Sequence, residues 1–320
     1  MGEPRGRVAR PYSDAMPADR RDEHAALVAL LRTLPKGARW GDVTERVLEN
    51  GSAVDLWAEG EGDTLIASPG RAGVLAEAAR DLDHWHGQGW RFLGILDQEY
   101  PARVREVHQA PPFLFAAGSV VGDDRAIAVV GSRKASRRSL EIASTVATEL
   151  AREGITVVSG LADGVDTAAH RAALDAGART VAVIGTGISR SYPRVNQDLQ
   201  RRIANDGLVL SQFWPDASPQ RHNFIMRNAV MSGYGRATVV VQAGEQSGAR
   251  AQARLAVQHG RPVILTDQVV SGTEWGARLR DRAGVYVASS LGDILRHVHA
   301  ALARESEIDA LLSELEGSTL

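Results

Sequence analysis

Hydrophobic residues recur at helical spacing in the N-terminal part of the chain, with polar residues between them. A helix is predicted from His24 to a stop at Pro35, and a second one at residues 43–50, where an Asn-Gly pair ends it. A third helix is predicted at residues 71–85, and residues 91–96 are a candidate strand. The pattern predicts a small helical module.

After residue 124 the pattern changes to short β-branched runs that alternate with helical stretches, which is typical of parallel strands joined by crossover helices. The predicted strands are residues 126–130, 156–159, 180–184, 208–210, 238–241, 262–265 and 285–288. The connecting helices are predicted to begin near Ser136, Asp166, Asn196, Phe224, Gly248 and Gly276. We therefore expect an α/β fold with a Rossmann-like, doubly wound, mostly parallel sheet, closed by a helix at residues 291–304.

These patterns also predict the division of the chain. Residues 1–21 are rich in Pro, Arg and Asp and are expected to form a mobile tail. The helical module and a connecting segment take residues 22–118, and the sheet domain takes residues 119–298. Residues 299–320 are expected to form a C-terminal helix and tail.

Composition narrows the class of protein. The 320 residues are 44% hydrophobic and 24% charged, which suffices for a folded core. The absence of cysteine excludes disulfides, thiolate zinc sites and a cysteine nucleophile. No apolar run approaches the ~20 residues of a membrane span, and the first residues lack the apolar stretch of a secretion signal, so we expect a cytoplasmic location. With a net charge of −2, any anion site must be built locally.

The loop after residues 126–130 is the first candidate site, because open parallel sheets bind ligands beyond the carboxyl ends of their strands. It carries Gly131, Ser132, Arg133 and Lys134 directly before a helix. Glycine lets the backbone approach a ligand closely, and the amides of a helix N-terminus together with two cations attract an anion. The loop predicts a phosphate site; a glycine turn with solvated cations is the alternative.

Glycine-rich loops follow the next two strands. In the first of them, Gly160 is a candidate phosphate contact, and Asp166 is interpreted as a helix cap one turn before His170, or as half of a metal pair that lacks a third ligand. In the second, a phosphate contact is expected from Arg190, and Tyr192 is expected to stack on a base or to pack in the turn. The candidates of that second loop are Gly185, Thr186, Gly187, Arg190, Tyr192 and Asn196.

Two further stretches complete one expected crevice. Arg227 and Asn228 interrupt an apolar helical run, so they need partners, which a bound phosphate or neighbouring carbonyls would supply. Ser247 and Gly248 open another helix after residues 238–241. We predict no catalytic residue, no metal site and no cofactor.

Several enzyme motifs are absent from the sequence. It contains no Gly-x-x-x-x-Gly-Lys-Ser/Thr loop, Gly-x-Ser-x-Gly elbow, His-Glu-x-x-His pair or full Gly-x-Gly-x-x-Gly fingerprint. An ordinary ATPase, hydrolase, metalloprotease or dehydrogenase is therefore disfavoured.

The order of the loop motifs resembles that of the DNA-processing protein A family, DprA/Smf. The resemblance rests on Gly-Ser-Arg-Lys-Ala-Ser at 131–136, Ser-Gly-Leu-Ala-x-Gly-Val-Asp at 159–166, Gly-Thr-Gly at 185–187, Tyr-Pro at 192–193 and Arg-Asn at 227–228. It spans roughly residues 24–298, and the helices ahead of the sheet are similar in placement to the family's sterile-alpha-motif-like (SAM-like) module.

The resemblance implies binding of single-stranded DNA by a homodimer without turnover, protection of incoming strands during natural transformation, and their handover to the recombinase RecA. Ser132, Arg133 and Lys134 match the family's basic loop, and Arg190 stands where the family often has a cation.

The sequence also departs from the family pattern. Asp163 stands where the family typically has Arg, and Ala229 stands where a second Arg follows the Arg-Asn pair. Ile225 replaces Pro, Gln242 replaces Glu, and Arg-Ala-Gln-Ala at 250–253 replaces Leu-Ile-Thr-Ala. Fewer cations predict weaker phosphate binding and a flatter salt response, since each neutralised phosphate contributes a slope of about −0.7.

Two other functions fit the same crevice. A nucleotide-sensing or nucleotide-processing protein of the wider Rossmann superfamily, which includes the LOG-type cytokinin-activating phosphoribohydrolases, would hold one small nucleotide. Asp163 and the near-neutral charge favour such a compact ligand, whereas the Pro-Gly-Gly-x-Gly-Thr-x-x-Glu signature of those enzymes is absent. The third possibility is a scaffold that binds only protein.

Overall fold

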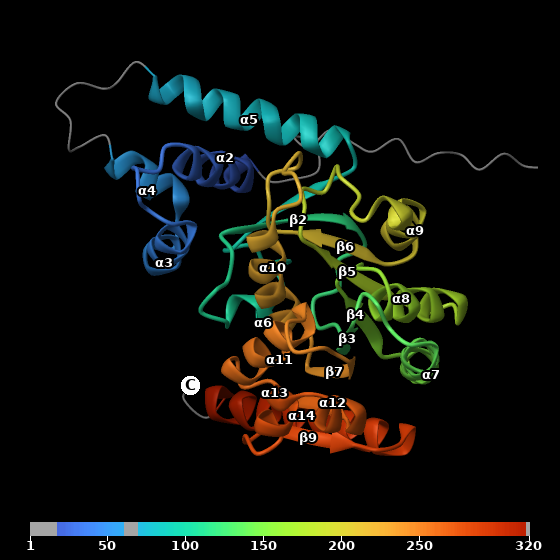
Figure 1. The fold of residues 1–320 in the computed structure, drawn as a ribbon. Coiled ribbons are helices and arrows are strands. Elements are labelled where there is room, and N and C mark those ends of the chain that lie inside the picture. Colours follow the sequence, from blue (N-terminus) through green and yellow to red (C-terminus); the bar gives the residue numbers. More distant parts are fainter. Residues whose placement is uncertain (1–17, 61–69, 318–320) are drawn as a thin grey trace, which may run out of the picture.

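The helical module is present in the computed structural model, which describes residues 18–60 and 70–317 (Figure 1). Its helices are α2 (Ala18–Arg32), α3 (Trp40–Asn50), α4 (Ala53–Glu59) and α5 (Arg71–Gly87). Residues 18–21, predicted as tail, belong to α2, and the rest of the predicted tail lies outside the described residues.

Helix α4 is absent from the sequence prediction, because a tertiary contact fixes it. The hydroxyl of Ser52 accepts a hydrogen bond from the backbone of Asp55, and the carboxylate of Glu23 on α2 accepts from Ser52 and from the amide of Ala53. This short helix is therefore held from its N-terminus by a distant residue.

Within the described residues, a mixed sheet of 9 strands forms the centre of the molecule, in the order β1-β2-β6-β5-β4-β3-β7-β8-β9. The strands β3 to β9 are parallel to one another, as predicted. Their bounds are β3 (Ala126–Gly131), β4 (Thr156–Ser159), β5 (Thr180–Ile184), β6 (Leu208–Ser211), β7 (Ala237–Gln242), β8 (Val263–Thr266) and β9 (Val285–Ala288). The predicted Rossmann-like α/β fold is confirmed.

Two antiparallel strands extend this sheet beyond β6. Strand β1 (Arg91–Gly94) pairs with β2 (Phe113–Gly118), which pairs with β6. The sequence analysis missed β2, because the prolines at 111–112 mark a connection rather than a strand. These strands precede residue 119, so the sheet extends across the predicted domain boundary.

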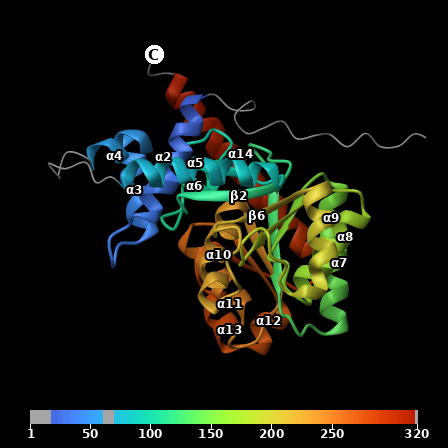
Figure 2. The ribbon, with the colours of Figure 1, turned by 90° about the horizontal axis from the view of Figure 1, so that it is seen from above.

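Helices cover both faces of the sheet. Seen from above, α7 (Arg137–Arg152), α8 (Val165–Asp175) and α9 (Gln197–Asp206) lie on one side, and α10 (Arg221–Tyr234) and α11 (Gly248–Gln258) lie on the other (Figure 2). The remaining elements are α6 (Ala102–Arg105), the 3-10 turn η1 (Arg194–Asn196), α12 (Asp267–Gly272), α13 (Glu274–Leu279) and α14 (Leu291–Gly317). Helix α14 thus continues past the predicted end at residue 304, and no described helix is long and apolar enough to cross a bilayer.

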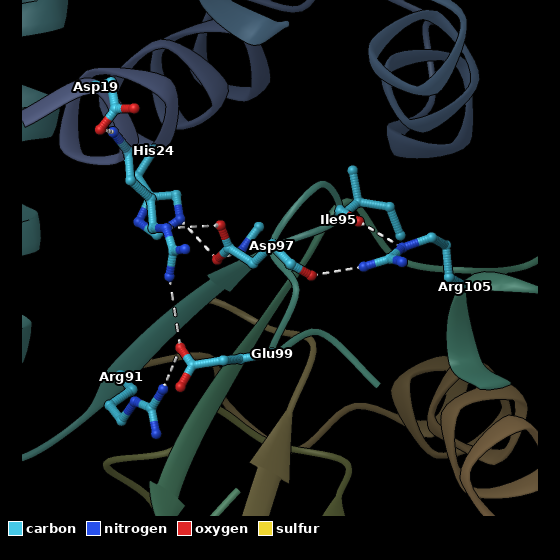
Figure 3. A network of polar contacts seen from close by, with 9 residues as sticks. Asp19, His24, Arg91, Ile95, Asp97, Glu99 and Arg105 are labelled. Carbon is cyan, nitrogen blue, oxygen red and sulfur yellow. Dashed lines mark hydrogen bonds and ion pairs between the residues drawn. The ribbon is translucent and has the colours of Figure 1, made fainter. Parts of the chain in front are cut away.

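A polar network fixes α2 to the turn after β1 (Figure 3). The imidazole of His24 lies 2.8 Å from the carboxylate of Asp97, which also accepts a hydrogen bond from the backbone of Gly94. Arg105 donates to the carbonyls of Ile95 and Asp97. Because His24 and Asp97 are buried, this contact joins the helical module firmly to the sheet.

The direction in which successive strands are added to the sheet reverses between β3 and β7. From β3 it builds β4, β5 and β6 outward, and α10 then carries it back to β7 on the other side of β3. The carboxyl ends of β3 and β7 therefore meet at a topological switch point, where open α/β sheets bind ligands.

Candidate nucleic-acid interface

A cleft of about 930 Å³ opens at this switch point. One wall is the loop after β3, and the opposite wall consists of α10 and the start of α11. The predicted site residues that line it are Gly131, Ser132, Arg133, Lys134, Tyr192, Arg227, Asn228, Ser247 and Gly248. Residues from three separate loops and from α10 thus meet in one place.

The basic loop after β3 has a fixed backbone and free cations. The hydroxyl of Ser132 accepts a hydrogen bond from the amide of Lys134 (3.1 Å), and the amide of Ser136 donates to the side chain of Gln242 on β7 (2.9 Å). Arg133 and Lys134 are exposed. The loop therefore presents two full positive charges to the cleft without a carboxylate that neutralises them among the described ion pairs.

An aromatic wall stands beside these cations. The ring of Phe224 lies 5.5 Å from that of Tyr192, and the guanidinium of Arg133 lies 5.3 Å from the Phe224 ring centre. Tyr192 is 41% exposed, so part of its ring is free to stack on a planar ligand. Gly185 makes room for this wall, because a Cβ there would lie 2.5 Å from the Phe224 ring.

A buried charge pair lies behind the wall. Arg227 is only 5% exposed, donates to the carbonyl of Val183 and lines the cleft together with Asp166. Burial lowers the pKa of Arg227 to about 10, and Asp166 opposes this shift. Burial also raises the pKa of Asp166, against the charge of Arg227. Arg227 therefore remains a cation at neutral pH.

The role of Asp166 differs from the predicted helix cap. Its carboxylate accepts hydrogen bonds from the amides of Gly160 (3.1 Å) and Ala162 (3.4 Å), so it closes the loop after β4. The N-cap of α8 is Gly164, which has no side-chain bond. His170 is buried against Thr180, and no group of three His, Asp or Glu able to hold a metal exists within residues 18–60 and 70–317.

The start of α11 closes the opposite side of the cleft. Ser247 is the N-cap, and its hydroxyl accepts a hydrogen bond from the amide of Arg250. Asn228 is buried and donates to the carbonyl of Gly248 at 3.4 Å. The hydrogen bond from Asn228 to Gly248 connects α10 to α11 at the cleft.

The sequence of the chain matches a known protein family over most of the sheet domain. Residues 91–299 match the family model described as DNA recombination-mediator protein A. The chain belongs to this family, DprA/Smf. The DNA processing protein DprA of Streptococcus pneumoniae is 37% identical over 210 residues, which cover 65% of this chain and 74% of that protein. The putative DNA processing protein DprA of Mycobacterium tuberculosis is 35% identical over 252 residues, which cover 74% of this chain and 65% of that protein.

Solved DprA structures share the fold. The Streptococcus pneumoniae structure superimposes with a TM-score of 0.60 at 30% identity and covers 87% of this chain and 94% of that one. A second solved structure is that of the Helicobacter pylori DprA, and it is described as showing a single-stranded DNA binding mode of that protein. It has a TM-score of 0.58 at 24% identity, and the match covers 67% of this chain and 96% of that chain. At that identity the second likeness shows the fold alone.

The remaining DprA/Smf motif residues that we predicted as phosphate contacts lie outside the lining of the cleft. Asn196 is buried and donates to Leu161 and Thr167, so it supports the loop after β4. Gly187 packs against the carbonyls of Trp214 and Pro215. The other residues with this placement are Gly160, Gly185, Thr186 and Arg190. The structure thus places these residues away from the cleft lining and packs them against partners within the protein, and phosphate contacts by them stay a prediction.

Arg190 and Thr186 show why residues of this loop do not line the cleft, because each is held by a partner within the protein. Arg190 donates through Nε to the carbonyl of Asp216 (2.6 Å), which turns its guanidinium toward the loop after β6. Thr186 is 1% exposed, and its carbonyl accepts a hydrogen bond from Ser211. Of the loop after β5, only Tyr192 lines the cleft.

The lining residues that the sequence analysis did not predict as ligand contacts include Arg221, Phe224 and Gln252. Phe224 precedes Arg227 by one helical turn, so the two share a face of α10, and that spacing is the signal available in the sequence. Arg221 begins α10, and Gln252 lies one turn inside α11. Two departures from the DprA pattern, Asp163 and Ala229, lie outside the lining of the cleft.

Proposed function

We propose that this cleft binds single-stranded DNA without breaking it. The observation that carries the proposal is the convergence of exposed cations and exposed aromatic surface in one cleft. Arg133, Lys134 and Arg221 line it together with Tyr192 and Phe224. Phosphates attract the cations, and an unpaired base stacks on the aromatic wall.

Single strands suit this geometry better than a duplex. A base in a duplex already stacks on its neighbours and offers only its edges, whereas an unpaired base can place its face on Tyr192. Tyr192 and the basic loop both line the cleft, so a strand bound there contacts Tyr192 through a base and the loop through a phosphate.

The wider role is part of the same proposal. In the DprA/Smf family to which the chain belongs, relatives are named DNA processing proteins, and the Helicobacter pylori protein has a single-stranded DNA binding mode. We infer that this chain protects strands as a homodimer, hands them to RecA and carries out no turnover. A cytoplasmic location stays a prediction.

The test is equilibrium binding of a labelled ~20-nucleotide single strand and of its duplex at two salt concentrations. The expected result is tighter binding of the single strand, with an affinity that falls as salt rises. Equal affinities would contradict the preference for single strands. Displacement of the strand by low concentrations of a mononucleotide would instead support the alternative of a nucleotide-binding protein.

A further inference from the structure

A second hollow, of about 460 Å³, lies between the helical module and the sheet domain. Its lining includes the indole rings of Trp85, Trp90 and Trp214, and we call it the tryptophan pocket. Trp90 and Trp214 are partly exposed as well as lining the pocket, so a ligand can reach part of their surface. The pocket therefore offers flat aromatic surface of the kind on which a planar ligand stacks.

The tryptophan pocket and the cleft share two loops. The loop after β5 contributes Ser189 to the tryptophan pocket and Tyr192 to the cleft. The loop after β6 contributes Asp216 to the tryptophan pocket and Pro219 to the cleft. In each loop the two residues are three positions apart, so their Cα atoms are separated by about 11 Å at most. A stacked single strand covers that distance with about three nucleotides.

Arg190 follows Ser189 in the loop that both hollows share. Its Nε donates to the carbonyl of Asp216 at 2.6 Å, which holds the guanidinium beside the tryptophan pocket. The residue is exposed, and its two amino nitrogens make no hydrogen bond within the described part of the chain. A phosphate between the two hollows can therefore accept charge-assisted hydrogen bonds from this guanidinium.

The charges of the tryptophan pocket favour a base over a phosphate. Asp81 forms an ion pair with Arg32 at 2.5 Å, and the guanidinium of Arg32 lies 5.7 Å from the ring centre of Trp214. Asp216 is exposed, and its carboxylate has no ion pair with any described residue. This carboxylate repels a phosphate, whereas the N–H groups that every unpaired base carries can donate hydrogen bonds to it.

We propose that the tryptophan pocket holds a second base of the strand whose first base stacks on Tyr192. The phosphates between these two bases pass Arg190, which lies outside the lining of the cleft. This inference rests on the proposed function and extends the bound strand from the sheet domain to the helical module. The helical module then takes part in strand binding, through Trp85 and Arg32.

The first test cross-links the unmodified protein to short single strands that carry 5-iodouracil at one position, which is varied. Ultraviolet light joins this base to an aromatic side chain on which it stacks, and mass spectrometry identifies the labelled residue. One position should label Tyr192, and a position about three nucleotides away should label Trp90 or Trp214. Labelling of Tyr192 without either tryptophan at any position would overturn the inference and leave the proposed function standing.

The second test measures the affinity of a long single strand for variants of the tryptophan pocket. Trp90→Ala should weaken binding roughly fivefold to a hundredfold, the value of one stacked base, whereas Trp90→Phe keeps a ring and should retain most of the affinity. Unchanged affinity in Trp90→Ala would overturn the inference.

The third test measures the slope of log affinity against log salt for the same strand. Arg190→Ala should reduce the magnitude of this slope by about 0.7, the value of one phosphate contact. Arg201→Ala is the matched control, because this exposed arginine lines neither hollow, and it should leave the slope unchanged. Equal slopes in the two variants would contradict the path past Arg190. If the unmodified protein bound no strand at all, the proposed function would fail and the inference with it.

Discussion

The guanidinium of Arg227 lies against the backbone of Gly160, where a Cβ atom would stand 1.9 Å from Nη1. This contact joins α10 to the loop after β4 and fixes the cation behind the aromatic wall. Gly160 therefore leaves the space that the guanidinium of Arg227 occupies. That role explains why a glycine suits this strand end although it does not line the cleft.

Gly160→Ala is expected to displace Arg227 and to lower both stability and strand affinity. Forcing a methyl group into a packed interior costs about 1–3 kcal/mol. Urea unfolding and strand binding measure the two effects. Gly122→Ala is the control, because a Cβ there would meet nothing within 4 Å. If Gly160→Ala behaved like Gly122→Ala in both measurements, the packing argument would be wrong.

Tyr192→Ala should weaken binding of a single strand by about 1–3 kcal/mol, the usual value of one stacked base. The salt dependence should stay the same, because no charge is removed. Tyr192→Phe keeps the ring and should retain most of the affinity. A loss in Tyr192→Ala that Tyr192→Phe shares would assign the effect to the hydroxyl and contradict stacking.

Gln252→Met should stabilise the protein in the absence of DNA. The substitution removes a buried amide without partners among the described residues and retains similar volume, so the free energy of unfolding should rise by about 1–3 kcal/mol. Denaturant unfolding measures this change through a shift of the midpoint. A fall in stability would show that the amide is satisfied within the folded chain.

Stability should decrease in acid partly because of His170. Burial, helped by the charge of Arg227, lowers the pKa of His170 to about 3, below its ordinary value in the unfolded chain. The unfolded state therefore binds a proton first, and stability should fall by about 1.4 kcal/mol per pH unit as the pH drops from about 6 toward 3. Burial also lowers the pKa of His259 to about 4, which acts in the same direction.

The measurement is the free energy of unfolding as a function of pH for the unmodified protein and for His170→Asn. The variant should show a flatter decline between pH 6 and 4, whatever its stability at pH 7. His222 is exposed, so His222→Asn should keep the original slope. Identical slopes in all three proteins would exclude His170 as the cause.

The parallel strands could be predicted because each is a short aliphatic or β-branched run between helical stretches. The cleft could be predicted in part, since strand ends of a parallel sheet must share an edge, and Gly131 to Lys134 follow one of them directly. Strand β2 could not, because the prolines at 111–112 directly ahead of it mark a connection rather than a strand. The inward direction of the Asn196 side chain could not be predicted either, since it depends on hydrogen bonds to Leu161 and Thr167.

The most direct test of strand binding at the basic loop is the slope of log affinity against log salt for a single strand. Arg133→Ala and Lys134→Ala should each reduce the magnitude of the slope by about 0.7, the value of one phosphate contact. Arg201→Ala removes an exposed arginine on α9 outside the cleft and should leave the slope unchanged. Slopes in Arg133→Ala and Lys134→Ala equal to that of the unmodified protein would contradict the account.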